Sequence, residues 1–241
     1  MSTSRSKPLT NTIYHKLVEH IVSGKCKPGE PISELALTKE LGVSRTPVHN
    51  AVLQLTKDGL IEQEHNRRPV VKGLTREDIY QIYEMRIVLE GEAARHATFR
   101  ISKSRLTKLE QIHQEVEAFQ GSRNEWLDTW ANYDNIFHQT IATSTGNKLL
   151  AEDVNRYRLL HRGLNLNGLA EEMAPLETMR SAIDEHAHIL HALNHKNAEA
   201  ARDSMRMHLR RWQEYFEDLF ENSPDVLSEA PNLLVVGKMN D

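Results

Sequence analysis

The segment from Gly42 to Ile61 constrains the fold more strongly than any other part of this sequence. It reads GVSRTPVHNAVLQLTKDGLI. Ser44 is a suitable N-cap, Pro47 lies in the first turn, where its missing N–H costs little, and Gly59 ends the helix. A shorter helix capped by Ser33 ends just before Gly42, which begins the turn between the two helices. This arrangement predicts a helix-turn-helix.

Three further elements flank the helix-turn-helix. Leu9 to Val22 carries apolar residues at helical spacing, so a helix is expected before it. After it, Ile61–Glu64 and Val70–Lys72 are separated by a short polar turn and are expected to pair as two strands. These elements together predict a winged helix-turn-helix domain over residues 1–75.

Two stretches before the helix-turn-helix make the pattern more specific. Lys25–Glu30 reads KCKPGE, and Ile32–Ala36 reads ISELA. Together with the VSRTPV core of Val43–Val48, they resemble the DNA-binding domain of the GntR family of bacterial transcription regulators, over roughly residues 9 to 72. The resemblance implies binding to double-stranded operator DNA.

The N-terminal end of a recognition helix enters the major groove, so side chains there are the first candidates for DNA contacts. Arginine can donate paired hydrogen bonds to guanine, whereas hydroxyl groups suit phosphate oxygens. The residues predicted to contact DNA are Ser44, Arg45, Thr46, His49 and Asn50 in the recognition helix, and Arg67 and Arg68 in the wing.

Two positions depart from the pattern of the family. His49-Asn50 stands where family members usually have Arg-Glu, which alters the expected base preference. The wing tip lacks the usual glycine after Asn66-Arg67, which removes a close backbone approach to the minor groove but leaves an arginine to insert there. The alternatives are an ordinary capped helix start at Ser44 and a solvated turn for Arg67 and Arg68.

Charge is distributed unevenly along the chain. The net charge of −4 does not by itself suggest a nucleic-acid partner. Residues 1–75 nevertheless hold 11 Lys/Arg and 7 Asp/Glu, a balance of +4, whereas the remaining residues hold 19 and 27, a balance of −8. A basic head on an acidic body is expected when only one domain meets phosphates.

The sequence favours a cytoplasmic protein without a membrane partner. No apolar run approaches the ~20 residues that a membrane span needs, and the N-terminal segment lacks the apolar core of a secretion signal. The single cysteine, Cys26, excludes an internal disulfide and fits a reducing compartment. Its thiol is either a redox sensor or a buried or merely inert group.

The pattern is helical throughout the rest of the chain. Thr75 with Asp78 resembles a helix-start signal. Helices are predicted over 76–98, 103–120, 123–145, 147–164, 174–195 and 197–222. The expected fold class is therefore mainly α, with the winged helix-turn-helix followed by an all-helical bundle over 76–222. The tail, 223–241, is expected to be loosely ordered.

Three of these helices carry polar residues inside otherwise apolar stripes. Asp134 and His138 lie one turn apart on the first, His186 lies on the second and His208 on the third. Burial of such groups is costly unless they pair or bind something. One carboxylate and three imidazoles form a suitable ligand set for a divalent transition metal. His188, His191 and His195 fall on an opposite, polar face and are expected to be solvated.

The same arrangement resembles the FCD effector domain of the FadR subfamily. Metal-binding members of that subfamily place Asp-x-x-x-His on one helix and one histidine on each of two later helices. The resemblance covers roughly residues 76 to 220 and implies that Asp134, His138, His186 and His208 are metal ligands. Zinc is the expected ion, with nickel and manganese as alternatives.

Arginines in the same domain are candidates for an anionic effector. Arg86 lies within an apolar stripe, and in the FCD family the corresponding arginine faces the ligand pocket. An ion pair with Glu90 is the alternative. Asn135, Arg158 and Arg162 are further candidates for the pocket.

These features together predict a homodimeric, ligand-responsive transcription regulator and not an enzyme. Its metal and a small organic acid would modulate operator binding. Two alternatives remain at this point. An open metal site could activate water in a hydrolase, or the metal itself could be the signal.

Overall fold

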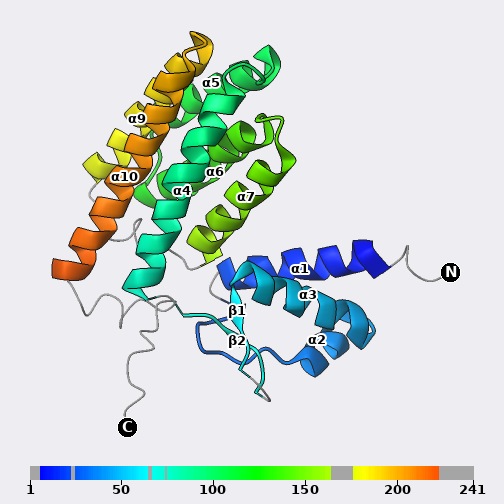
Figure 1. Ribbon diagram of the computed structural model, residues 1–241. Coiled ribbons are helices and arrows are strands. Elements are labelled where there is room, and N and C mark those ends of the chain that lie inside the picture. Colours follow the sequence, from blue (N-terminus) through cyan, green and yellow to red (C-terminus); the bar gives the residue numbers. More distant parts are fainter. Residues whose placement is uncertain (1–5, 23–24, 65–66, 74, 164–175, 223–241) are drawn as a thin grey trace. The chain divides into compact units, whose positions relative to one another are not determined.

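The computed structural model of the chain describes residues 6–22, 25–64, 67–73, 75–163 and 176–222 (Figure 1). The chain divides into two compact units: the first contains Met1–Asp78 together with the short segments that begin at Leu159 and Phe220, and the second contains Ile79–Arg158 and the segment that ends at Leu219. The division lies close to the predicted boundary after residue 75. None of the described helices combines the length and the apolar character that a membrane span requires. The predicted tail, 223–241, lies outside the described residues.

The first unit has the elements of a winged helix-turn-helix. Its helices are α1 (Ser6–Val22), α2 (Glu34–Leu41) and α3 (Arg45–Asp58). Two short strands follow, β1 (Ile61–Glu62) and β2 (Val70–Val71), and they pair antiparallel. The prediction for this part is confirmed, although α1 begins before Leu9.

Local signals explain where these helices begin and end. The side chain of Ser33 accepts a hydrogen bond from the Ala36 N–H at 3.2 Å, which caps α2. Gly42 and Gly59 end α2 and α3 with φ of 64° and 87°, a left-handed conformation that favours glycine. Ser44 occupies the N-cap of α3, but its hydroxyl makes no capping hydrogen bond.

Packing of α1 against α3 forms the core of the winged helix-turn-helix unit. One face of α3 is buried by Pro47, Val48, Ala51, Val52 and Leu55. The apolar stripe of α1, with Ile13, Leu17 and Ile21, is buried as well. The opposite face of α3 therefore remains exposed.

The second unit is formed by helices throughout its described part. These are α4 (Arg76–Ala97), α5 (Lys103–Glu117), α6 (Arg123–Thr143), α7 (Lys148–Gly163), α9 (Leu176–Asn194) and α10 (Ala198–Asn222). Their bounds lie within a few residues of the predicted ones, with the largest difference at the end of α5. The predicted fold class is confirmed.

Two of these helices begin at reciprocal caps. The Asp78 N–H donates to Thr75 Oγ1 at 3.1 Å, and the Thr75 N–H donates to Asp78 Oδ2 at 3.0 Å, which confirms the predicted start of α4. Ser122 and Glu125 form the same arrangement at the start of α6. These caps fix the residue at which each helix starts, and both helices carry residues of the site described below.

The interior of the bundle contains a small number of buried polar residues among aromatic and aliphatic side chains. Figure 1 shows α4 crossing the bundle with α9 and α10 on one side and α6 and α7 on the other. Tyr83 of α4 contacts Phe216 of α10, and both are almost fully buried. Tyr133 and Phe137 of α6 are completely buried. Polar groups among such residues are removed from water, so their partners determine their energy.

Candidate metal centre and DNA-contact surface

The predicted DNA-contact residues of α3 share one exposed surface. Ser44, Arg45, Thr46, His49 and Asn50 are all exposed, while the opposite face of α3 packs into the head. The side chain of Arg45 is 82% exposed, so it is accessible to a groove. The N-terminal turn of α3 thus has the accessibility that a recognition helix needs.

Glu34 of α2 joins two of these residues. It accepts from Arg45 Nε at 3.3 Å and lies 2.8 Å from His49 Nδ1. Its own side chain is only 15% exposed. Sequence reasoning missed Glu34, because the contacts cross 11 and 15 residues between two helices. Glu34 therefore holds Arg45 and His49 side by side at the surface.

The wing residues are exposed as well. Arg67 pairs with Glu64 at 2.9 Å, and Gln63 donates to the Arg67 carbonyl at 3.1 Å. Arg68 is exposed. The surface pair of Arg67 agrees with the alternative of a solvated turn, and the exposure of both arginines leaves them accessible to DNA. Asn66, at the tip, lies outside the described residues.

Cys26 in the same unit has the properties of an inert thiol. It is half-buried, and burial raises the pKa of its thiol, with Glu30 and Glu40 acting in the same direction. A raised pKa lowers the thiolate fraction, and the thiolate is the reactive form.

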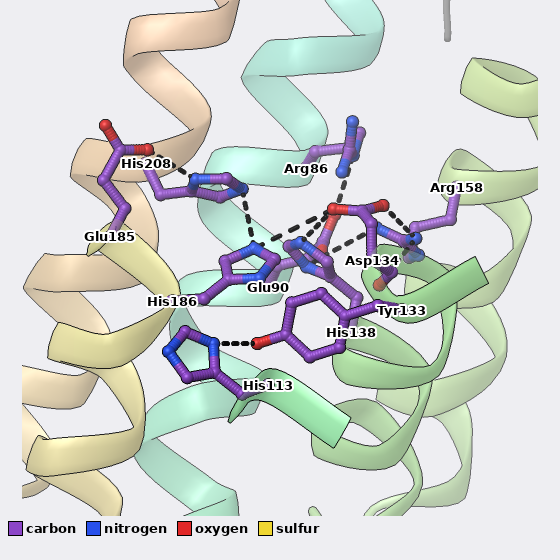
Figure 2. Close-up of polar contacts among 10 residues, drawn as sticks. All are labelled: Arg86, Glu90, His113, Tyr133, Asp134, His138, Arg158, Glu185, His186 and His208. Atoms are coloured by element: carbon purple, nitrogen blue, oxygen red, sulfur yellow. Dashed lines mark hydrogen bonds and ion pairs between the residues drawn. The ribbon is translucent and has the colours of Figure 1, made fainter. Parts of the chain in front are cut away.

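The four predicted metal ligands come together inside the helical unit (Figure 2). One ligand atom from each of Asp134, His138, His186 and His208 lies within 4.8 Å of those of the others. The three histidines are 0–2% exposed, and the Asp134 side chain is 14% exposed. The cluster draws its residues from α6, α9 and α10, so only the folded bundle assembles it.

Carboxylates behind two of the rings orient them toward the centre. Glu90 Oε2 lies 2.5 Å from His138 Nδ1, and Glu185 Oε2 lies 2.7 Å from His208 Nδ1. A carboxylate on Nδ1 fixes the tautomer with the proton there and leaves the Nε2 lone pair for a metal. The Nε2 atoms of His186 and His208 accordingly face each other at 3.3 Å.

His186 is held differently, by the faces of aromatic rings. Its ring stacks on Phe137, with centroids 3.9 Å apart and planes 6° apart, and lies 5.2 Å from Trp130. Its Nδ1 is buried and has no hydrogen-bond partner within the described part of the chain. Tyr133, which packs edge-on to the same ring, is anchored by His113 at 2.8 Å.

Electrostatics favour the protonation states of a metal-binding set. Burial lowers the pKa of His186 well below its usual value, and the neighbouring histidines act in the same direction. Burial also lowers the pKa of His208. For Asp134, burial raises the pKa, but His138 and Arg158 outweigh it and hold the pKa well below the usual range. A neutral imidazole of His186 or His208 beside an ionised carboxylate can bind a cation without first losing a proton.

The contacts among the four residues suit coordination of a divalent cation better than direct hydrogen bonding among the residues themselves. His138 Nε2 is buried and, among the described residues, has no hydrogen-bond partner. It lies 3.3 Å from Asp134 Oδ1, so a lone pair faces a carboxylate oxygen when the proton is on Nδ1. A cation at this point would turn these repulsive contacts into coordination bonds. The residues present therefore fit such an ion.

The predicted effector residues differ in their surroundings. Arg86 is 3% exposed, and its Nε donates to Glu90 Oε1 at 2.7 Å, so the ion pair considered as its alternative is present. Arg158 donates to Asp134 Oδ2 at 3.0 Å and thus belongs to the cluster. Asn135 is half-buried next to Asp134, and Arg162 is half-buried one turn beyond Arg158.

Two carboxylates of the site were not predicted. Glu90 had been considered only as a partner of Arg86, yet it also pairs with His138 and lies 3.8 Å from Arg158 Nη1. Glu185 pairs with His208 and with Arg211. The sequence carried no signal for either carboxylate, because each histidine partner lies on another helix. His188, His191 and His195 are exposed, as expected, and lie outside the cluster.

This fold defines a class of protein. A winged helix-turn-helix with an exposed, polar recognition helix precedes a helical unit whose buried cluster is suited to a ligand. Such an organisation is that of a DNA-binding regulator with a separate sensing domain.

The chain belongs to the GntR family of bacterial regulatory proteins and is a transcriptional regulator of that family. The family described as "Bacterial regulatory proteins, gntR family" matches residues 9–71, and the FCD domain family matches residues 81–211. The uncharacterized HTH-type regulator YdhC of Bacillus subtilis is 32% identical, with 88% of this chain and 92% of that protein covered. The repressor RspR of Escherichia coli is 25% identical, with 93% and 96% covered.

Solved structures show the same fold. The E. coli protein McbR/YncC matches 89% of this chain and 98% of its own with a TM-score of 0.70, at 21% identity. A GntR-type regulator from Rhodococcus sp. RHA1 matches 90% and 99% with a TM-score of 0.68, at 24% identity.

Proposed function

We propose that this regulator binds a divalent metal ion at Asp134, His138, His186 and His208, and that a small organic acid bound at this metal modulates operator binding. The observation that carries the proposal is that one ligand atom from each of the four residues lies within 4.8 Å of the others, with a carboxylate on Nδ1 of His138 and of His208. Zinc is the expected ion, and nickel and manganese are alternatives. The metal would supply a positive centre for a carboxylate.

The protein residues have distinct roles in this proposal. Glu90 and Glu185 orient the metal-binding rings. Arg86 and Arg158 place two further positive charges beside the cluster, and Asn135 and Arg162 remain candidate contacts for the acid. Binding of the acid would favour one arrangement of the DNA-binding heads over another, which changes operator affinity by linkage.

Two measurements test this proposal together. Elemental analysis should find about one divalent ion per chain. Operator titration of the metal-loaded protein should then show an affinity that shifts on adding an acid that stabilises the protein against heat. Acids that bind without moving operator affinity would rule out the acid as the signal. Operator affinity that follows the metal alone would favour the metal-sensing alternative.

A hydrolase fits the site less well. The two buried glutamates beside the cluster are both engaged, Glu90 by Arg86 and His138, and Glu185 by His208 and Arg211. A general base needs a carboxylate that can take a proton from water. The named relatives are regulators, which favours a function without catalysis.

Arg45→Ala tests the DNA-contact surface. The exposed guanidinium held by Glu34 is expected to read a base in each half-site, so the variant should lose about 1–3 kcal/mol of discrimination at one position. Lys57→Ala, an exposed change at the other end of α3, serves as the control. Mobility-shift assays with wild-type and single-base-changed operators measure both. An unchanged base preference for Arg45→Ala would show that Arg45 does not read sequence.

We propose a homodimer because two DNA-binding domains, each reading one half of a near-palindromic operator, recognise the operator more specifically than one domain does. Large apolar side chains are exposed along the outer surface of α4, with Val88 at 54% and Phe99, just after the helix, at 66%. Such side chains on one helix face favour a self-complementary contact between two copies.

Val88→Asp is therefore expected to shift the protein toward monomer and to weaken operator binding. A buried charge without a partner opposes association. Leu149→Asp is a matched control, because Leu149 is 72% exposed on α7. Sedimentation velocity distinguishes the two states. A dimer that persists in Val88→Asp places the interface elsewhere.

A further inference from the structure

The two ring nitrogens of His49, on the exposed surface of α3, have different surroundings. Nδ1 lies 2.8 Å from Glu34 Oε1, across the contact between α2 and α3. The His49 side chain is 52% exposed, and among the described residues its Nε2 makes no hydrogen bond. Nε2 is therefore the ring nitrogen that remains available to a base in the major groove.

Glu34 determines which nitrogen carries the proton when the ring is neutral. An ionised carboxylate only accepts hydrogen bonds, so the nitrogen that faces it must donate. The single proton of the neutral ring then lies on Nδ1, and Nε2 presents a lone pair. The Glu34 carboxylate is fixed in this position, because its side chain is only 15% exposed and also accepts from Arg45 Nε at 3.3 Å.

An acceptor in the major groove selects one kind of chemical group. The hydrogen-bond donors that bases present there are the exocyclic amino groups, N6 of adenine and N4 of cytosine. Guanine O6 and N7 are acceptors, and they would repel a second lone pair. Arg45 can only donate, so it suits guanine. The two residues that share Glu34 therefore differ in the base edge that they can read.

We infer that His49 reads an exocyclic amino group, adenine N6 or cytosine N4, in each operator half-site, and that Glu34 sets this preference by keeping the ring proton on Nδ1. The inference rests on the proposed DNA-contact surface of α3, and it adds the chemical group that this surface recognises. His49 is a specificity-determining residue, and Glu34 is a positioning residue that acts through His49.

The test removes single base atoms from the operator. Selection from a pool of random duplexes with the full-length protein at pH 8, where imidazole side chains are mostly neutral, first identifies the half-site. Operators are then made with purine in place of one adenine, or 2-pyrimidinone in place of one cytosine, which deletes the amino group alone. Other operators carry 7-deazaguanine, which lacks the N7 acceptor. Affinities are measured for the wild type and for His49→Ala.

One amino deletion in each half-site should weaken binding of the wild type by roughly threefold to tenfold, the size of one net hydrogen bond. The same deletion should leave the affinity of His49→Ala unchanged, because its partner is already absent. The analogue that has this effect tells adenine from cytosine. If no amino deletion depends on His49, or if the effect of 7-deazaguanine depends on it, the inference is overturned.

Glu34→Gln tests the positioning role. An amide both donates and accepts, so either tautomer of His49 can pair with it, and the loss caused by the amino deletion should shrink. Glu40→Gln is the matched control, because Glu40 is an exposed residue of the same helix that pairs with Lys16. It should retain the full loss. A loss in Glu34→Gln as large as in the wild type overturns the role of Glu34.

Failure of the DNA-contact surface gives a different result. Wild-type protein that enriches no sequence overturns that surface and this inference with it. Wild-type protein that enriches an operator, and whose discrimination falls in Arg45→Ala while no amino deletion depends on His49, overturns the inference alone. The effect of each base analogue on the wild type is measured without any variant, so it does not depend on whether a variant folds.

Discussion

Replacing His186 by alanine is expected to abolish stoichiometric metal binding. The ring contributes one of the four convergent ligand atoms from the centre of the bundle, and the three remaining ligands with solvent would hold the ion far more weakly. A metal present at about a thousand times its dissociation constant stabilises the fold by about 4 kcal/mol. Wild-type protein should therefore lose thermal stability on chelation, whereas His186→Ala should not respond.

The control for this prediction lies on the same helix. His191 is exposed and outside the cluster, so His191→Ala should bind metal as the wild type does. Trp130 lies 5.2 Å from the His186 ring and provides a spectroscopic signal, because nickel bound there should quench its fluorescence. Equal metal content in wild type and His186→Ala would reject the site.

Glu90→Ala is expected to have the largest effect on folding itself. Glu90 is 2% exposed and pairs with Arg86 and His138. Removing one partner of a buried ion pair leaves an uncompensated charge and costs about 3–5 kcal/mol. Chemical denaturation of the metal-free protein measures this loss without a contribution from metal.

Glu84→Ala is the matched control, since Glu84 lies on the exposed side of the same helix. It should change the free energy of unfolding by at most about 0.5 kcal/mol. If both variants unfold at the same denaturant concentration, Arg86 has found another partner, and the assignment of Glu90 as its essential counter-ion is wrong.

Much of the fold follows from local signals in the sequence. Ser33, Gly42 and Gly59 define the helix-turn-helix through capping and left-handed turns, which depend only on nearby residues. Thr75 and Asp78 fix the start of α4 in the same way. The end of α5 was predicted too late because Ala118–Gln120 carries no strong stop signal, and tertiary packing decides where such a helix ends.

The site was less predictable, and the reason is physical. Helical periodicity shows which residues share a face, so it identified the four convergent residues together with the family resemblance. It does not show which residue of another helix lies opposite. His138 and Glu90 are 48 residues apart, and Arg45 and Glu34 are 11 apart. Contacts of this kind depend on how helices pack, which the spacing along one helix does not encode.

The stacking of the His186 ring affects which metal ions the proposed site would accept. Phe137 and Trp130 confine the plane of the ring, but within the described part of the chain no hydrogen bond at Nδ1 fixes its rotation within that plane. We therefore expect the His186 ring to rotate within its plane to follow ions of different radius, while carboxylates hold His138 and His208. A metal site with one adjustable ligand discriminates little between ions of different radius. If the site binds a metal as proposed, we expect the supply of each ion to decide which one is bound, so protein isolated from zinc-, nickel- or manganese-supplemented cultures should carry the supplied ion.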